Sequence, residues 1–172
     1  DERTGTHMAD GYARASNRPG VILAGQNGPG ATNLVTGIAQ AAAAFSPVVS
    51  IAGSFSTKDK AQDAFQGVDQ QSLFKPITKK TWTINKTKKI PKIFSEAFKL
   101  SMSPRRGPVQ LNLPRNILSD NAKFNINLNN KSYENESTIK GKKNDIKRAA
   151  EVINSGSKKV IIAGGGIKYA GK

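Results

Sequence analysis

Several residue types with strong chemistry are scarce in this chain of 172 residues. Cysteine is absent, which excludes disulfide bonds, thiol nucleophiles and cysteine-ligated zinc or iron–sulfur sites. The single histidine excludes a metal site built from several histidines. Aromatic residues make up only 6% of the chain, and no apolar run approaches the roughly 18 consecutive residues of a membrane-spanning helix. The sequence therefore predicts a globular protein, long enough for one domain or for one domain and the start of another.

Acidic residues are also few, 12 against 27 Lys and Arg, and the formal net charge is +15. The first 57 residues contain three of each sign, so the whole excess lies from Lys58 onward, where Lys stands among many Asn. This mixture indicates a solvated basic surface rather than a stripe shaped for nucleic acid. We expect a cytoplasmic protein with no nucleic-acid and no membrane partner. From charge alone, a non-catalytic nucleotide- or nucleic-acid-binding α/β module is the alternative.

Helical and strand-like patterns alternate along the chain. Helices are predicted over 6–17, 31–45, 89–102 and 144–155, and strands over 21–24, 47–53, 80–85, 107–114 and 159–163. Continuous apolar runs such as 21–24 are typical of strands that are buried on both faces. Strands that alternate with helices predict an α/β fold, in which a parallel sheet is flanked by helices.

Residues 117–143 interrupt this alternation, because they are dense in Asn, Lys and Ser and lack periodic apolar residues. We predict a first domain over 1–118, truncated at its N-terminus, a linker over 119–143 and the start of a second α/β domain over 144–172. The strand at 160–163 should belong to a second sheet. The chain starts without Met and stops just after a strand-like run, so we expect it to be a piece of a longer polypeptide.

Three features are candidates for chemistry. Residues 26–30 form a glycine-containing turn between a strand and a helix, where backbone N–H groups can approach a ligand. Glu2 stands just ahead of the first helix, and a long polar loop over 54–71 contains Phe65 and Gln66. Each feature also has an ordinary explanation: a sharp turn, a solvated carboxylate near a helix N-terminus and a solvated loop. Taken singly, they leave the function open.

Five motifs taken in order are more specific. They are Glu2 with HMADGYAR (7–14), NGPGATN (27–33), DAFQ (63–66), PITK (76–79) and GPVQLNLP (107–114). Together they resemble thiamine-diphosphate enzymes of the acetolactate synthase type over about residues 1–116, and residues 146–166 resemble the start of that family's middle domain. The resemblance implies most of an N-terminal pyrimidine-binding domain and a small part of a middle domain. The domain that carries the magnesium and diphosphate site would be absent.

The resemblance also implies roles for individual residues. Glu2 would hydrogen-bond a ring nitrogen of the cofactor's aminopyrimidine and promote loss of the thiazolium C2 proton, with burial raising its pKa toward neutrality. The cofactor would take up the electrons released when a 2-oxo acid loses carbon dioxide. Phe65 and Gln66 would approach the substrate side from the neighbouring subunit, and no metal ligand is expected in this chain. The cofactor contacts would come from Gln26, Asn27, Gly28, Pro29, Gly30 and Asn33.

Two departures from the family's pattern leave open which enzyme of the family this chain resembles most. Acetolactate synthases usually have Thr-Ser where this chain has Gln26 and Asn27, and these residues together with 110–112 look more like sulfoacetaldehyde acetyltransferase. The first enzyme joins an acyl unit to a keto acid, whereas the second passes an acetyl unit to phosphate. We expect an acyl-transferring carboligase with a 2-oxo acid substrate, and sulfoacetaldehyde is the alternative substrate. A catalytically inactive regulatory module is a further alternative.

The same resemblance implies the cofactors and the assembly. The expected cofactors are thiamine diphosphate and Mg²⁺, and the motifs leave open whether FAD binds as well. The helix predicted over 31–45 is nearly all small or apolar, so it should be covered on more than one side. We therefore expect a dimer or tetramer for the full-length enzyme, and no activity for residues 1–172 alone.

Overall fold

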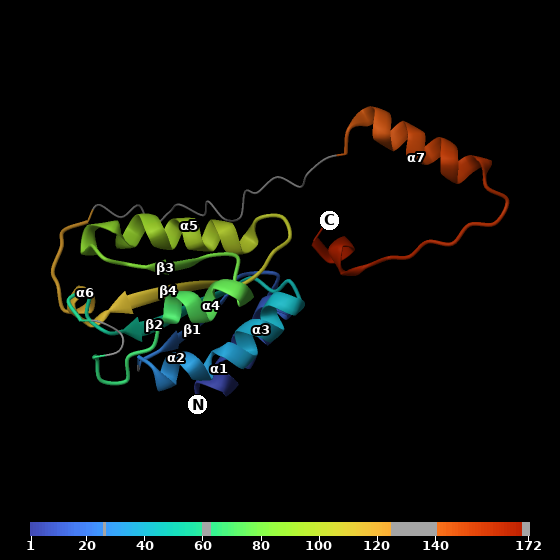
Figure 1. Cartoon of the computed structure of the whole chain (residues 1–172). Helices are drawn as coiled ribbons and strands as arrows, with labels where there is room; N and C mark the ends of the chain where they lie inside the picture. The colour runs from blue at the N-terminus through green and yellow to red at the C-terminus, as the bar shows by residue number, and fades with distance from the viewer. Residues whose placement is uncertain (26, 60–62, 125–140, 170–172) are drawn as a thin grey trace. The chain divides into compact units, whose positions relative to one another are not determined.

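A computed structural model of the protein describes residues 1–25, 27–59, 63–124 and 141–169 (Figure 1). The chain divides into two units, Asp1–Glu134 and Asn135–Lys172. The first unit contains the sheet and the helices packed on it, and the second contains one α-helix and one 3₁₀ helix. Among the described residues, no helix is both long enough and apolar enough to span a membrane.

Four strands of the first unit form one parallel sheet. They are β1 (Gly20–Ala24), β2 (Val48–Ser54), β3 (Thr81–Thr83) and β4 (Val109–Pro114), in the spatial order β1-β2-β4-β3. Every neighbouring pair is parallel, with Val21 opposite Val49, Ser50 opposite Gln110 and Thr81 opposite Gln110. This topology confirms the predicted α/β fold with its parallel sheet, in which the strands near Val21, Val48 and Val109 lie together.

Helices and short turns connect these strands. They are α1 (Glu2–Ser16), α2 (Pro29–Asn33), α3 (Val35–Ala43), α4 (Gln70–Phe74), η1 (Lys75–Ile77), η2 (Thr87–Lys89), α5 (Ile90–Met102) and α6 (Arg115–Leu118). α1 and α3 lie on one side of the sheet and α5 lies on the other, so both faces carry a helical layer (Figure 1). The observed α5 matches the helix predicted over 89–102.

Side chains alternate between these two layers along β2. Val48 and Ala52 face the cluster under α1 and α3, whereas Val49 and Ile51 face the cluster under α5. The first cluster also contains Leu34, Ile38 and Phe74, and the second also contains Ile84, Val109 and Leu111. Because each large apolar side chain that is fully buried stabilises the fold by about 1.5–3 kcal/mol, these clusters hold the sheet and its strand ends in place.

The first strand is not buried on both faces, which corrects the expectation for 21–24. β1 is an edge strand, and α1 covers only the face that carries Ile22. Val21 and Leu23, on the opposite face, are 50% and 67% exposed. A continuous apolar run indicates burial only where both layers extend over the strand, and α5 contacts β2 and β4 instead.

Two predicted helices have different bounds in the structure. α1 begins at Glu2 rather than at residue 6, because the Asp1 side chain caps it by accepting from the Arg3 N–H. The helix predicted over 31–45 is two helices, α2 and α3, which meet at Leu34. Helix α2 therefore starts directly after the glycine-containing turn, and Pro29 occupies its first position, where proline is favourable.

The second unit contains α7 (Lys143–Ser155), which confirms the helix predicted over 144–155, and η3 (Gly165–Tyr169). The strand predicted over 159–163 is wrong for this chain: residues 160–163 have no strand pairing, and Val160, Ile161 and Ile162 are exposed. A parallel strand needs a neighbour to satisfy its backbone groups, and the described part of this unit offers none. Much of the linker predicted over 119–143 lies outside the described residues.

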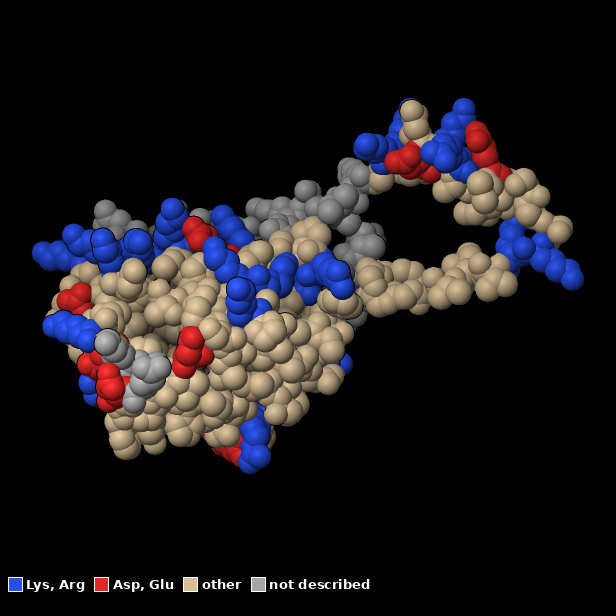
Figure 2. All heavy atoms as spheres, in the orientation of Figure 1, with Lys and Arg blue, Asp and Glu red and all other residues tan. Residues whose placement is uncertain are grey.

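One stretch of basic side chains in the first unit follows η2 and α5. Figure 2 shows Lys and Arg side chains along the upper edge of the first unit, where Figure 1 places α5. Lys88, Lys89, Lys92 and Lys99 are exposed there, and Lys92 lies 4.0 Å from Glu96 in an exposed ion pair. Isolated exposed pairs of this kind contribute little to stability.

Candidate functional site

The carboxylate of Glu2 lies where α1 meets α2. Glu2 is the first residue of α1, and Asn33 is the last residue of α2. The Asn33 side chain donates from Nδ2 to Oε2 of Glu2 over 3.1 Å. The Thr6 hydroxyl donates to the backbone oxygen of Glu2 over 2.6 Å and fixes the first turn of α1. Because Glu2 is only half-buried, a ligand can reach its carboxylate.

The surroundings of Glu2 favour its charged form. Its own backbone N–H and then the Asn33 amide donate to the carboxylate, and both lower the pKa of Glu2 below its ordinary value, against a smaller opposing effect of desolvation. The raised pKa that we expected for Glu2 is therefore wrong for this chain, because the described residues do not enclose the carboxylate. At neutral pH it is an ionised acceptor for a ligand N–H.

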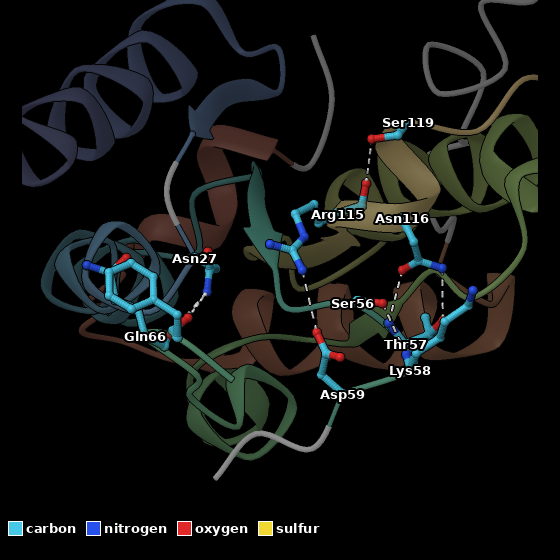
Figure 3. A network of polar contacts seen from close by, with 10 residues as sticks. Asn27, Ser56, Thr57, Lys58, Asp59, Gln66, Arg115, Asn116 and Ser119 are labelled. Atoms are coloured by element: carbon cyan, nitrogen blue, oxygen red, sulfur yellow. Dashed lines mark hydrogen bonds and ion pairs between the residues drawn. The ribbon is translucent and has the colours of Figure 1, made fainter. Parts of the chain in front are cut away.

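The glycine-containing turn packs against the loop that carries Phe65 and Gln66. Asn27 donates from Nδ2 to the backbone oxygens of Phe65, over 3.1 Å, and of Gln66, over 3.3 Å (Figure 3). Gly28 has a φ of 59°, and a Cβ there would lie 2.1 Å from the Gln66 backbone oxygen. Only glycine permits both this conformation and this approach. One chain therefore supplies both the turn and Phe65 with Gln66, which lie together without a neighbouring subunit.

A polar pocket of about 490 Å³ opens beside this contact. It lies where β2 ends at Ser54 and where Arg115 follows β4. Figure 3 shows Arg115 directed toward Asp59, and its guanidinium lies 3.7 Å from that carboxylate. The further lining residues are Asn27, Phe55, Lys58, Asp63, Ala64 and Phe65. The pocket thus combines charges of both signs with an exposed aromatic side chain.

The structure brings the predicted site residues together in two groups. Glu2 lies with Asn33, and the residues of the turn lie with Phe65 and Gln66. Pro29 is exposed and Gly30 is buried, both in the first turn of α2, while Gln26 lies outside the described residues.

The pocket residues Ser54, Asp59 and Arg115 were not predicted. A general rule offers the missing signal, because the carboxyl ends of neighbouring parallel strands meet at one edge of a sheet and ligands bind there. Ser54 ends β2, Arg115 follows β4, and these strands are neighbours, so knowledge of the strand order would have identified both residues.

Comparison with known proteins gives this geometry a context. Residues 1–73 match the family described as "Thiamine pyrophosphate enzyme, N-terminal TPP binding domain". The N-terminal half of the first unit is therefore similar to this family's N-terminal domain. The site residues Glu2, Asn33 and Phe65 all fall within it, and the predicted resemblance to thiamine-diphosphate enzymes is confirmed.

Curated proteins match almost the whole length of the chain. It is 42% identical to a probable acetolactate synthase large subunit of Methanococcus aeolicus over 99% of its own length. It is 41% identical to the acetolactate synthase large subunit of Buchnera aphidicola subsp. Schizaphis graminum over 96% of its length. It is 38% identical to the isozyme 3 large subunit of Escherichia coli, again over 99%. The chain spans about 29% of the length of the curated relatives it matches.

Proposed function

We propose that this chain is the pyrimidine-binding part of a thiamine-diphosphate-dependent enzyme of the acetolactate synthase type. The observation that carries the proposal is the accessible, ionised Glu2 held by Asn33 inside the TPP-enzyme domain. The full-length enzyme would decarboxylate a 2-oxo acid and transfer the acyl unit to a second keto acid. The names of the three relatives given above, each an acetolactate synthase large subunit, support this choice.

The residues present fit an aminopyrimidine. The Glu2 carboxylate accepts hydrogen bonds, and its lowered pKa keeps it ionised, so it can accept a hydrogen bond from a protonated ring nitrogen. When bound, thiamine diphosphate supplies a carbon nucleophile and an electron sink for decarboxylation. Asn33 orients the Glu2 carboxylate by donating to Oε2, and the turn at 27–30 presents backbone groups beside Phe65. Glu2 thereby holds or moves one proton at the ring nitrogen.

Other components of the enzyme lie outside the residues that carry this site. We place the Mg²⁺ and diphosphate contacts in a separate domain, and we infer a homo-oligomer, dimer or tetramer, in which that domain meets the pyrimidine-binding one. The name "large subunit" among the relatives supports an oligomeric assembly. Residues 1–172 alone would then neither bind thiamine diphosphate tightly nor turn over substrate.

Sulfoacetaldehyde acetyltransferase is the second candidate. Gln26 and Asn27 in the turn, with the buried Gln110 and Asn112 of β4, are the features that favour it. A product assay separates the two candidates directly. Formation of 2-acetolactate from pyruvate supports the first function, and formation of acetyl phosphate from sulfoacetaldehyde and phosphate supports the second.

The substitution Glu2→Gln in the full-length enzyme tests the proposed function. The amide keeps the shape of the side chain but cannot take up the proton, so turnover should fall about 10²–10⁴-fold. Binding of thiamine diphosphate, measured by calorimetry, should weaken only modestly, because the diphosphate contacts lie elsewhere. Glu96→Gln, which makes the same change at a surface ion pair on α5, should leave both quantities unchanged. Unaltered turnover in Glu2→Gln would show that Glu2 has no role in catalysis and is only a carboxylate at the end of a helix.

A further inference from the structure

The exposed side chain of Phe65 is presented by a tight turn. The Gly67 N–H donates to the Ala64 backbone oxygen over 2.8 Å, and Gln66 has a φ of 55°, in the left-handed region. Phe65 at the tip is 83% exposed and lines the polar pocket beside Arg115. An aromatic side chain so exposed has few contacts of its own to fix it, so its position depends on how the backbone of 64–67 is held.

A side chain from outside the loop, that of Asn27, donates hydrogen bonds to this backbone. Its Nδ2 carries two hydrogens, and its distances of 3.1 Å and 3.3 Å to the oxygens of Phe65 and Gln66 allow one bond to each. Asn27 is half-buried, and the backbone of its neighbour Gly28 packs directly on the Gln66 oxygen. The turn and the loop, 38 residues apart in sequence, are therefore joined at adjacent points.

The chemistry of this contact requires an amide. A serine hydroxyl carries one hydrogen on a shorter side chain and cannot donate to both oxygens. An aspartate of the same shape has no hydrogen to donate when ionised and would face two backbone oxygens with a negative charge. The donor group of Asn27 is thus committed to the loop rather than free for a cofactor.

We propose that Asn27 is a positioning residue that fixes Phe65 as a wall of the substrate pocket. This inference rests on the proposed function, because it assigns the pocket beside Arg115 to the 2-oxo acid. Asn27 acts on substrate binding through Phe65, so its loss should raise KM more than it lowers kcat.

The experiment compares the full-length enzyme with its Asn27→Asp and Asn27→Ser variants. Hydrogen exchange of residues 64–68, measured without substrate, reports directly on how firmly the Asn27 hydrogen bonds hold the loop. The values of kcat and KM for pyruvate report on the substrate pocket. Asn85→Asp makes the same chemical change at an exposed position between β3 and η2 and is the matched control. Exchange in β2 and α5 shows whether each variant keeps its fold.

In Asn27→Asp, the exchange rate at 64–68 and the KM for pyruvate should each rise about tenfold, as expected from losing two neutral hydrogen bonds. The value of kcat should change less than about threefold. Asn27→Ser should lie between this variant and the parent, and it carries the test alone if Asn27→Asp does not fold. Unchanged exchange at 64–68, or faster exchange with an unchanged KM, would overturn the positioning role. A parent enzyme that does not consume pyruvate refutes the proposed function instead. The exchange result at 64–68 still tests whether Asn27 holds the loop.

Discussion

Charged side chains that are buried or half-buried in this protein make several hydrogen bonds each. The Lys79 ammonium donates to the backbone oxygen of Leu100 over 2.6 Å and to both oxygens of Ser103, at 2.6 and 3.2 Å. These acceptors lie at the C-terminal end of α5, where a positive charge is favourable. At the other side of the sheet, the buried Asp10 accepts two hydrogen bonds from Arg14, at 3.0 and 2.8 Å. The half-buried Lys79 and the buried Asp10 tolerate these environments because each makes at least two charge-assisted hydrogen bonds.

Asp69 provides a residue-scale prediction. Its carboxylate caps α4 by accepting from the Ser72 N–H, over 3.1 Å, and from the Ser72 hydroxyl, over 2.6 Å, and these two bonds lower the pKa of Asp69. Asp69→Ala should therefore lower the free energy of unfolding by about 1 kcal/mol at pH 7. Urea unfolding followed by circular dichroism measures this loss.

The pH dependence of that loss follows from the direction of the pKa shift. A depressed folded-state pKa means that the carboxylate's contribution is complete above the unfolded value of about 3.9 and disappears as the pH falls through the lower folded value. The difference between the parent and Asp69→Ala should accordingly shrink between about pH 5 and pH 2. Asp69→Asn retains an acceptor for Ser72 and should lose less. An equal difference at pH 7 and pH 2 would contradict this account.

At the scale of elements, local sequence patterns predicted whether a segment is a helix or a strand better than they predicted how that segment is buried. The apolar run of β1 correctly indicated a strand, but it could not show that β1 lies at the edge of the sheet with Val21 and Leu23 uncovered. The run at 160–163 differs from it by one residue, Ile for Leu, and forms no strand here, because strand formation depends on a neighbouring strand that the local sequence does not specify. Helix α5 was predictable because its apolar face and its length are local properties.

The candidate site shows the same division between local and distant information. Glu2 and the turn at 27–30 were identified through motifs, each contained in a short stretch of sequence. The contact between Asn27 and Phe65 joins residues 38 apart, and the ion pair of Arg115 with Asp59 joins residues 56 apart in the numbering. Such pairs become visible only when the strand order is known, because the order decides which loops share one edge of the sheet.

The packing of α3 on α1 gives an element-scale prediction. A Cβ at Gly37 would lie 2.5 Å from Cγ2 and 2.6 Å from Cβ of Thr6, and the Thr6 side chain is held by its hydrogen bond to Glu2. Gly37→Ala should push the helices apart and lower the free energy of unfolding by about 1–3 kcal/mol. Denaturant unfolding of the chain measures the effect.

Gly11 is the matched control, since a Cβ there would meet no atom within 4 Å and the residue lies in the middle of α1. Gly11→Ala should stabilise the chain by about 0.5–1 kcal/mol, because alanine has the better helix propensity. A stabilising Gly37→Ala would mean that α1 and α3 can separate at no cost, and the fixed distance between Asn33 and Glu2 would lose its explanation.

At the scale of the whole molecule, the two units differ in how they are stabilised. The first has two apolar clusters on either side of a four-stranded sheet. In the second, every residue described with its side chain is exposed, including Ile146, Val152 and Ile153 on α7. An isolated helix of 13 residues is marginal in water, because most helix stability in proteins comes from packing. The second unit therefore lacks the contacts that would make it stable alone.

Hydrogen exchange of residues 1–172 should separate the two units. Amides of β2 and β4, which pair on both sides within a buried sheet, should be protected at least about 10³-fold, whereas amides of α7 should exchange nearly as fast as in a peptide. Strong protection of α7 in this chain would show that the helix is packed and would contradict its exposed environment.

Val160, Ile161 and Ile162 are 86–93% exposed here, and burying each would stabilise a folded second domain by about 1.5–3 kcal/mol. If residues 144–172 are the start of a second domain, protection should appear in α7 and at 160–163 in the full-length protein, because further residues of that domain would cover both segments. If both segments still exchange freely there, residues 144–172 are not the start of a second α/β domain.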